Sequence, residues 1–200
     1  PQFLASWRTE ANVQAACTKL TASVGREALS YLLNDRCFKL EAVKHFKLGV
    51  EPDIAAITVP HYSIDGKLTA IKYRHWREEG EKRFSGIRGN NLQIYNGSIL
   101  ISSPFPWCIL TEGEFDCISL FQLASNIPIV AVPGMRTFKD RWLKWFERFE
   151  RIFLAFDRED SADERAEQLA QKLKDYRCYR IQFPPGIKDV NELVKASTHA

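Results

Sequence analysis

Two short apolar runs in the second half of the chain each end in a group of acidic residues. The first run, WCIL at residues 107–110, leads directly into the segment TEGEFDC at 111–117. The second run, IFLAF at 152–156, leads into the acidic segment DRED at 157–160. Runs of this length and composition predict buried strands. Because open parallel sheets bind ligands beyond the carboxyl ends of their strands, the two motifs together predict one carboxylate-lined site.

Strands and helices alternate through this half of the chain. Strands are predicted at residues 108–110, 129–132, 152–156 and 178–183, and helices at 116–124, 139–149 and 162–173. This alternation favours an α/β fold in which helices cover a parallel sheet. The helix predicted at 139–149 carries Trp142, Trp145 and Phe146 at helical spacing, which indicates a core face or a docking surface for a partner.

The first half follows a different pattern. Two short amphipathic helices are predicted at residues 25–33 and 39–46, followed by strands at 57–60 and 68–74 that an Asp65-Gly66 turn joins into a hairpin. Residues 1–24 carry no motif that we can interpret. The proline-containing segment 103–106 is a natural boundary, so we expect a smaller mixed α+β lobe at 1–103 and an α/β domain at 104–200.

Charge is distributed unevenly, although the formal net charge is only +3. Between Gly66 and Asn90 there are seven basic and three acidic residues, whereas between Asp157 and Arg165 there are five acidic and two basic ones. A basic lobe together with an acidic pocket suits the binding of phosphate and metal.

Other classes of protein are disfavoured. The five cysteines form no C-x-x-C pair, so we expect reduced thiols in a cytoplasmic protein and no zinc site. No apolar stretch approaches the roughly 20 residues that a membrane helix needs, and no signal peptide is evident. We therefore expect no membrane partner.

Each acidic residue also has a purely structural explanation. Asp116 lies at the predicted start of a helix, where an N-cap is common, and Glu112 could be a solvated loop carboxylate beside Gly113, which would allow a sharp turn. Asp157 and Glu159 could be polar residues that open a helix. These explanations fit poorly when both clusters follow strands of one sheet.

The motifs occur in the order found in a known family. TEGEFD at 111–116 resembles the E-G-x-x-D strand-to-helix turn of the Toprim fold, VPG at 132–134 resembles the strand and glycine turn that follow, and IKDVNE at 187–192 resembles the closing K-D-x-N-E segment. Across roughly residues 25–194 the chain is similar to the RNA polymerase domain of bacterial primases and phage primase–helicases. The resemblance implies a Toprim-type parallel sheet with flanking helices, preceded by a smaller basic lobe.

The second acidic motif departs from the family pattern. The family has D-x-D followed shortly by Ala-Gly, whereas this chain has DREDSA at 157–162. Either Glu159 replaces the second aspartate, or Asp160 does so from a shifted register.

The resemblance implies nucleotidyl transfer, in which a 3′-hydroxyl attacks the α-phosphate of a nucleoside triphosphate and short RNA primers form. The catalytic residues would be Glu112, Asp157 and Glu159. The same three residues, with Asp116 and Asp160, would hold the metal. Hard carboxylate oxygens suit Mg²⁺ or Mn²⁺.

Basic residues are predicted to bind the DNA template or the triphosphate, namely Lys72, Arg74, Lys82, Arg83, Arg88 and Lys188. Tyr73, Trp76 and Phe84 lie among the first of these, where aromatic rings suit base stacking. The same alternation also fits a strand with one solvated and one buried face. Lys188 and Asp189 would contact phosphate and metal, or simply form the turn that opens the last helix.

The implied partners are single-stranded DNA, nucleoside triphosphates and a replicative helicase domain or subunit, in the replication machinery of a bacterium or phage. Two other classes remain open. A Toprim nuclease or DNA-nicking enzyme would share the carboxylates but not the basic hairpin lobe. A catalytically silent replication module would keep the fold in order to bind DNA or a helicase.

Overall fold

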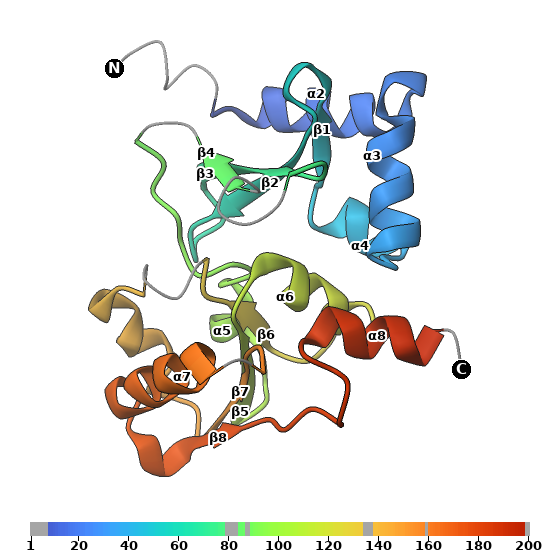
Figure 1. Cartoon of the computed structure of the whole chain (residues 1–200). Coiled ribbons are helices and arrows are strands. Elements are labelled where there is room, and N and C mark those ends of the chain that lie inside the picture. The colour runs from blue at the N-terminus through green and yellow to red at the C-terminus, as the bar shows by residue number, and fades with distance from the viewer. Residues whose placement is uncertain (1–7, 79–83, 87–88, 134–137, 159, 199–200) are drawn as a thin grey trace. The chain divides into compact units, whose positions relative to one another are not determined.

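The structure is a computed structural model that describes residues 8–78, 84–86, 89–133, 138–158 and 160–198, with no side chains described at 160–162 and 198. The chain divides into two compact units, Pro1–Gln93 and Ile94–Ala200 (Figure 1). The division comes earlier than the expected boundary after residue 103. Tyr95 and Ala131 exchange backbone hydrogen bonds of 2.9 and 3.2 Å, and Asn96 donates to the carbonyl of Ile129, so the segment after Gln93 is tied to the second unit.

The first unit contains an antiparallel sheet in the order β1-β2-β3-β4, with β1 at Gly49–Glu51, β2 at Ala56–Tyr62, β3 at Leu68–His75 and β4 at Phe84–Gly86. The predicted hairpin is confirmed, because β2 and β3 pair antiparallel across it. In its turn Gly66 has a φ of 81°, a value that favours glycine, and Ser63 donates its backbone N–H to Lys67 at 2.8 Å.

Helices pack beside this sheet, namely α2 (Glu10–Thr21), η1 (Ser23–Gly25), α3 (Arg26–Ser30), η2 (Tyr31–Asp35), α4 (Leu40–His45) and η3 (Pro52–Ile54). The segment α3–η2 and helix α4 confirm the two predicted helices, whereas α2 was not predicted. Helix α2 packs closely on β1 at Gly49, where an added Cβ would lie 2.6 Å from the Cβ atom of Ala16. Gly49 therefore permits this close packing.

The second unit contains a parallel sheet in the order β6-β5-β7-β8, with β5 at Trp107–Thr111, β6 at Ile129–Ala131, β7 at Arg151–Ala155 and β8 at Cys178–Arg180. All three strand pairs are parallel, which confirms the α/β prediction. Strand β8 is shorter than the strand predicted at 178–183.

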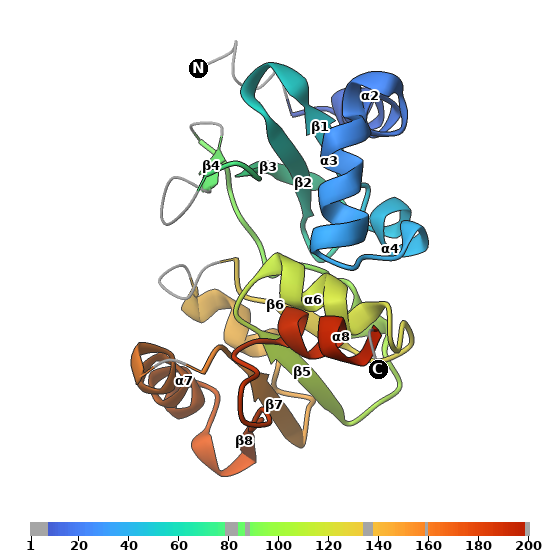
Figure 2. The same cartoon turned by 45° about the vertical axis from the view of Figure 1, so that its right-hand side comes forward.

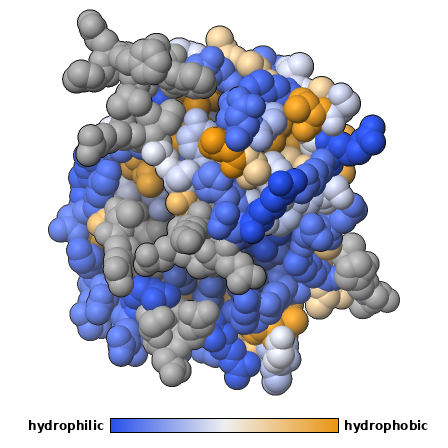
Figure 3. All heavy atoms as spheres, turned by 45° about the horizontal axis from the view of Figure 1, so that its top comes forward, coloured by the Kyte–Doolittle hydropathy of each residue, from blue (hydrophilic) through white to orange (hydrophobic). Residues whose placement is uncertain are grey.

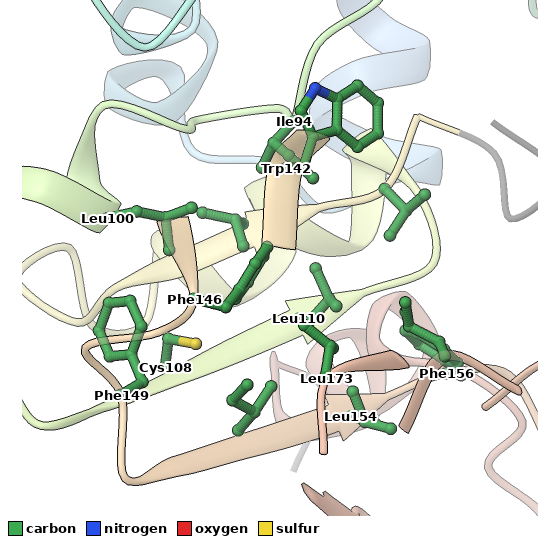
Figure 4. Close-up of a cluster of buried hydrophobic side chains, with 14 of the residues drawn as sticks. Ile94, Leu100, Cys108, Leu110, Trp142, Phe146, Phe149, Leu154, Phe156 and Leu173 are labelled. Carbon is green, nitrogen blue, oxygen red and sulfur yellow. The ribbon is translucent and has the colours of Figure 1, made fainter. Parts of the chain in front are cut away.

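Helices cover both faces of the parallel sheet (Figure 2). Helix α7 (Asp160–Lys172) packs on one face, where its apolar residues join a core that also contains α5 (Ile99–Ser102) and η6 (Asp140–Trp145). Helices α6 (Glu114–Phe121) and α8 (Val190–Thr198) pack together on the other face, and η7 (Asp175–Arg177) precedes β8. Figure 4 shows the larger core, in which large side chains from β5, β7 and the segment around η6 meet.

The segment predicted as an α-helix at 139–149 begins as the 3₁₀-helix η6. Its hydrogen bonds span three residues, from Trp142 N to Lys139 O at 2.8 Å and from Phe146 N to Leu143 O at 2.9 Å. Of the two alternatives for this segment, a core face is confirmed for Trp142 and Phe146, whose side chains are completely buried in the core shown in Figure 4. Trp145 is half-buried.

The face of the molecule shown in Figure 3 is mostly hydrophilic, and its hydrophobic areas are small and separate. Within the part of the chain that the structure describes, no helix has the length and apolar character required to cross a bilayer.

Candidate functional site

The carboxyl ends of β5 and β7 lie next to each other. Thr111 and Ala155, the last residues of these strands, pair directly in the parallel register. Glu112 therefore follows β5 immediately, and Asp157 follows β7 after one intervening residue. The two acidic segments reach the same edge of one sheet, which is where ligand sites form in open α/β folds.

Glu112 is held by an ion pair. The Nη2 atom of Arg165 in α7 donates to its Oε1 atom at 2.8 Å, and only 21% of the Glu112 side chain is exposed. The Oε2 atom is buried and has no hydrogen-bond partner among the described residues. The turn is fixed as well, because the hydroxyl of Thr111 donates to the carbonyl of Gly113 at 3.1 Å. The explanation of Glu112 as a solvated loop residue is therefore wrong.

Asp116 is the third residue of α6 and not its N-cap. The N-cap is Gly113, whose φ of −139° and ψ of 164° describe extended backbone that any residue adopts, so the expected sharp glycine turn is absent there. Instead, Oδ2 of Asp116 lies 3.4 Å from the position of a Cβ atom at Gly113. The Asp116 carboxylate is therefore directed back toward the start of the helix. Glu114, a residue not predicted to belong to the site, is also buried in this first turn.

Asp157 is half-buried, and its position is set through the backbone. Arg180, in β8, donates from Nη1 to the carbonyl of Phe156 and from Nη2 to the carbonyl of Asp157, each at 2.7 Å. The Nε atom of Arg180 also donates to Oδ1 of Asp163 in α7 at 3.1 Å. Arg180 therefore fixes the path of the chain between β7 and α7.

The segment before α8 supports the same strand end. Arg158 donates its backbone N–H to the carbonyl of Lys188 at 2.7 Å. Asp189 accepts from the backbone N–H of Glu192 at 2.7 Å, and the Glu192 carboxylate accepts from the N–H of Lys188 at 2.9 Å. These reciprocal bonds resemble a capping box, so Asp189 forms the turn that opens α8. The Lys188 ammonium lies 3.6 Å from Glu192, and its contact with phosphate stays a prediction.

Asn191 connects α8 to α6. Its amide donates to the hydroxyl of Ser119 at 2.9 Å, and that hydroxyl donates to the carbonyl of Phe115 at 2.9 Å. Both polar side chains are buried, so the chain of hydrogen bonds satisfies them and fixes the helix that carries Asp116.

The described oxygen donors fit a hard divalent cation. They are carboxylates at adjacent strand ends, and one buried oxygen of Glu112 has no protein partner within the described ranges, a pattern that a bound ion explains. The described residues alone contain no cluster of three metal-binding side chains. Glu159 lies outside them, as does the side chain of Asp160. Burial raises the pKa of Cys117 well above its usual value, which keeps this neighbouring thiol protonated.

In the first unit, β3 presents two of the predicted basic residues around one aromatic ring. The Nζ atom of Lys72 lies 4.4 Å from the centroid of the Phe84 ring, and the guanidinium carbon of Arg74 lies 5.1 Å from it. Arg74 is buried and donates to the hydroxyl of Tyr31 at 3.0 Å. Lys72 is half-buried and Phe84 is exposed. Three further predicted residues, Lys82, Arg83 and Arg88, lie outside the described ranges.

Two aromatic residues considered for base stacking have structural roles. Tyr73 lines a small cavity beside Val13 and Ala16 of α2, and burial raises the pKa of its hydroxyl. Trp76 donates its indole N–H to Glu27 at 3.2 Å. Of the three rings, Phe84 alone is exposed.

Comparison with known proteins agrees with this architecture. Residues 109–194 match a family model described as Toprim-like. No curated protein matches the chain. The primase fragment of the bacteriophage T7 primase–helicase has a TM-score of 0.68 and 18% identity over 82% of this chain and 68% of that one.

Bacterial primases align over more of the chain. The catalytic core of the Escherichia coli primase has a TM-score of 0.76 and 14% identity over 96% of this chain and 76% of that one. A DnaG primase catalytic domain bound to single-stranded DNA has a TM-score of 0.77 and 14% identity over 98% of this chain and 75% of that one. Residues 109–194 thus resemble the Toprim-like family, within a chain that has the fold of primase catalytic cores.

Proposed function

We propose that this chain is the catalytic core of a primase-type nucleotidyltransferase that makes short primers on single-stranded DNA. One observation carries the proposal. Glu112 and Asp157 follow directly paired strands of a parallel sheet, in a chain that shares the fold of primase catalytic cores. A nuclease would share the carboxylate edge, whereas Lys72 of β3, which lies beside the exposed Phe84 ring, would supply the additional phosphate-binding surface that a template requires.

The residues at this edge would position the reacting groups. Mg²⁺ or Mn²⁺, held by Glu112, Asp157 and Glu159 with Asp116 or Asp160, would stabilise the negative charge that develops on the phosphate oxygens. Because such a transition state requires positioning and charge stabilisation more than proton transfer, the chain's own task is to hold the carboxylates in fixed places. The contacts of Arg165 with Glu112 and of Arg180 with the backbone at Asp157 support that task.

Lys72 and Phe84 are the residues of the first unit best suited to contact the template. Phe84 is an exposed ring with a cation beside it, and bases stack on such rings while ammonium groups bind phosphates. Lys72→Ala should weaken single-stranded DNA binding uniformly across sequences and reduce the salt dependence by about one ion. Lys67→Ala, at the hairpin turn, is the control. Unchanged affinity in Lys72→Ala would leave Lys72 as a solvated residue of β3.

The proposed partners are a single-stranded DNA template, nucleoside triphosphates and a replicative helicase domain or subunit. The helicase is proposed because one structure with this fold comes from a primase–helicase. A pull-down with candidate replicative helicases tests this partner. Retention of the chain would support the proposal, and passage of the chain through the column would contradict it.

The direct test is to incubate the chain with single-stranded DNA, labelled nucleoside triphosphates and Mg²⁺ or Mn²⁺. We expect short labelled oligomers that depend on both the template and the metal. Cleavage of the DNA without oligomers would favour a Toprim nuclease, and DNA binding without either product would favour a silent replication module. Separate reactions with ribonucleotides and deoxynucleotides determine which of the two is used.

A further inference from the structure

Among the described residues, Arg165 is the one whose side chain contacts the Glu112 carboxylate. It lies in α7, the helix that begins at the last residue of the acidic segment after β7, and it reaches the end of β5. The contact therefore joins the two strand ends that carry the predicted ligands. Only 29% of the Arg165 side chain and 21% of the Glu112 side chain are exposed, so salt screens this pair less than it screens a surface pair.

The two oxygens of Glu112 differ in their surroundings. Oε1 accepts the Arg165 hydrogen bond at 2.8 Å, whereas the buried Oε2 has no partner among the described residues. A buried carboxylate oxygen without a hydrogen bond costs free energy, and in a native protein it calls for a water, an ion or a functional role. The geometry leaves one oxygen of Glu112 for a cation while the other is occupied.

We propose that Arg165 is a positioning residue that holds the Glu112 carboxylate through Oε1 and directs Oε2 to a divalent cation. This inference rests on the proposed function for the identity of the cation. An outer partner of this kind fixes the direction of a ligand and strengthens metal binding although it does not touch the metal. Arginine suits the role, because its planar guanidinium stays charged and has a fixed geometry.

Two other roles for Arg165 predict different results. If Arg165 only neutralised Glu112 in the absence of metal, the cation would have to displace it, and removing the arginine would tighten metal binding. If the ion pair served folding alone, removing it would lower the melting temperature without changing metal affinity. Metal affinity measured apart from activity therefore distinguishes the three roles.

The test is a titration of the whole chain with Mn²⁺, in which electron paramagnetic resonance measures the free ion, with a melting curve of each variant in chelator. We expect Arg165→Met to raise the Kd for Mn²⁺ by about 10- to 100-fold. Arg165→Lys keeps the positive charge but lacks the planar guanidinium, so its Kd for Mn²⁺ should lie between those of Arg165→Met and the wild type. Lys172→Met is the matched control, because Lys172 lies on the same helix and pairs with Asp140 at 2.6 Å.

Unchanged or tighter Mn²⁺ binding by a folded Arg165→Met chain would overturn the inference. If Arg165→Met fails to fold, the Arg165→Lys variant provides the test. A Kd for Mn²⁺ and a melting temperature that both equal those of the wild type would then overturn the inference. A different result would overturn the proposed function without overturning the role of Arg165. A chain that binds Mn²⁺ in an Arg165-dependent way but makes no oligomers would retain the positioning role and lose the polymerase activity. Absence of Mn²⁺ binding by the wild type would overturn the metal site and this inference together.

Discussion

The two strand ends of the candidate site are each held by an arginine, but in different ways. At the end of β5, Arg165 contacts the side chain of Glu112. At the end of β7, Arg180 contacts the backbone carbonyls of Phe156 and Asp157. A contact to the carboxylate fixes its direction and offsets its charge. A contact to the carbonyls fixes the path of the chain and does not depend on the side chain that the residue carries.

The difference means that equivalent substitutions at the two ends should not have equivalent effects. Replacing Glu112 removes a predicted ligand and one half of an ion pair. Replacing Asp157 removes a predicted ligand but leaves the two Arg180 contacts with the backbone in place. Replacing Glu112 should therefore lower both activity and stability, whereas replacing Asp157 should lower activity and leave stability almost unchanged.

The largest expected effect is on primer synthesis. Glu112→Gln and Asp157→Asn should each lower it by at least about a hundredfold, because each removes a carboxylate that stabilises charge in the transition state. The measurement is the yield of labelled oligomers at saturating Mg²⁺. Asp163→Asn, which changes an exposed carboxylate of α7, is the control. Near wild-type yield from Asp157→Asn would remove β7 from the site.

The next effect concerns Arg180. Arg180→Met should lower the free energy of unfolding by about 2–4 kcal/mol, because it leaves the carbonyls of Phe156 and Asp157 without their donor. Urea denaturation followed by circular dichroism measures the change. A loss below about 1 kcal/mol would mean that the contacts with the backbone contribute little.

A smaller effect separates the two carboxylates in metal-free buffer. Glu112→Gln should lower the free energy of unfolding by about 1 kcal/mol, because the partly buried Arg165 loses its carboxylate. Asp157→Asn should change it by less than about 0.5 kcal/mol, since Arg180 still holds the backbone. Thermal melts of both variants in chelator make the comparison. Equal losses would contradict the distinction between the two ends.

The smallest effect tests the exposed part of the Arg180 contacts. The Asp163 side chain is 64% exposed, so Asp163→Asn should change the free energy of unfolding by only about 0.5 kcal/mol or less, and salt should remove even that difference. Melting curves at low and high ionic strength provide the test. A larger, salt-resistant loss would show that Arg180 depends on Asp163 for its position.

The positions of the strands were predictable because burial controls them. The apolar runs at 107–110 and 152–156 fit the central strands of a parallel sheet, and their acidic ends reach one edge because parallel strands share a direction. The hairpin was predictable for a similar reason, since the Asp65-Gly66 turn supplies the positive φ at Gly66.

Other features depend on tertiary contacts that no local pattern records. The three-residue spacing of Trp142 and Trp145 fits a 3₁₀-helix as well as an α-helix, and the hydrogen bonds distinguish the two. Helix α2 has a weakly amphipathic sequence, so its local signal is limited to the Thr9 cap that accepts from the backbone N–H of Asn12, and its packing on Gly49 is a tertiary contact.

The contacts of Arg165 and Arg180 also depend on the tertiary fold. The sequence pattern indicates that Arg165 belongs to a charged helix face and that Arg180 is a polar residue of the last strand. Their partners lie 53 residues away at Glu112 and 23 residues away at Asp157, distances over which a single sequence gives no signal.

The strand order also determines when β5 can be completed as the chain is made. Strand β5 is synthesised before both of its neighbours, β6 and β7, and Arg165 follows all three. Until those segments leave the ribosome, the apolar run at 107–110 has no partner on either edge. Pairing between distant parallel strands is slow, and unpaired apolar edges promote aggregation. Strand β5, which Glu112 follows, is therefore the strand of this unit most exposed to mispairing in the nascent chain.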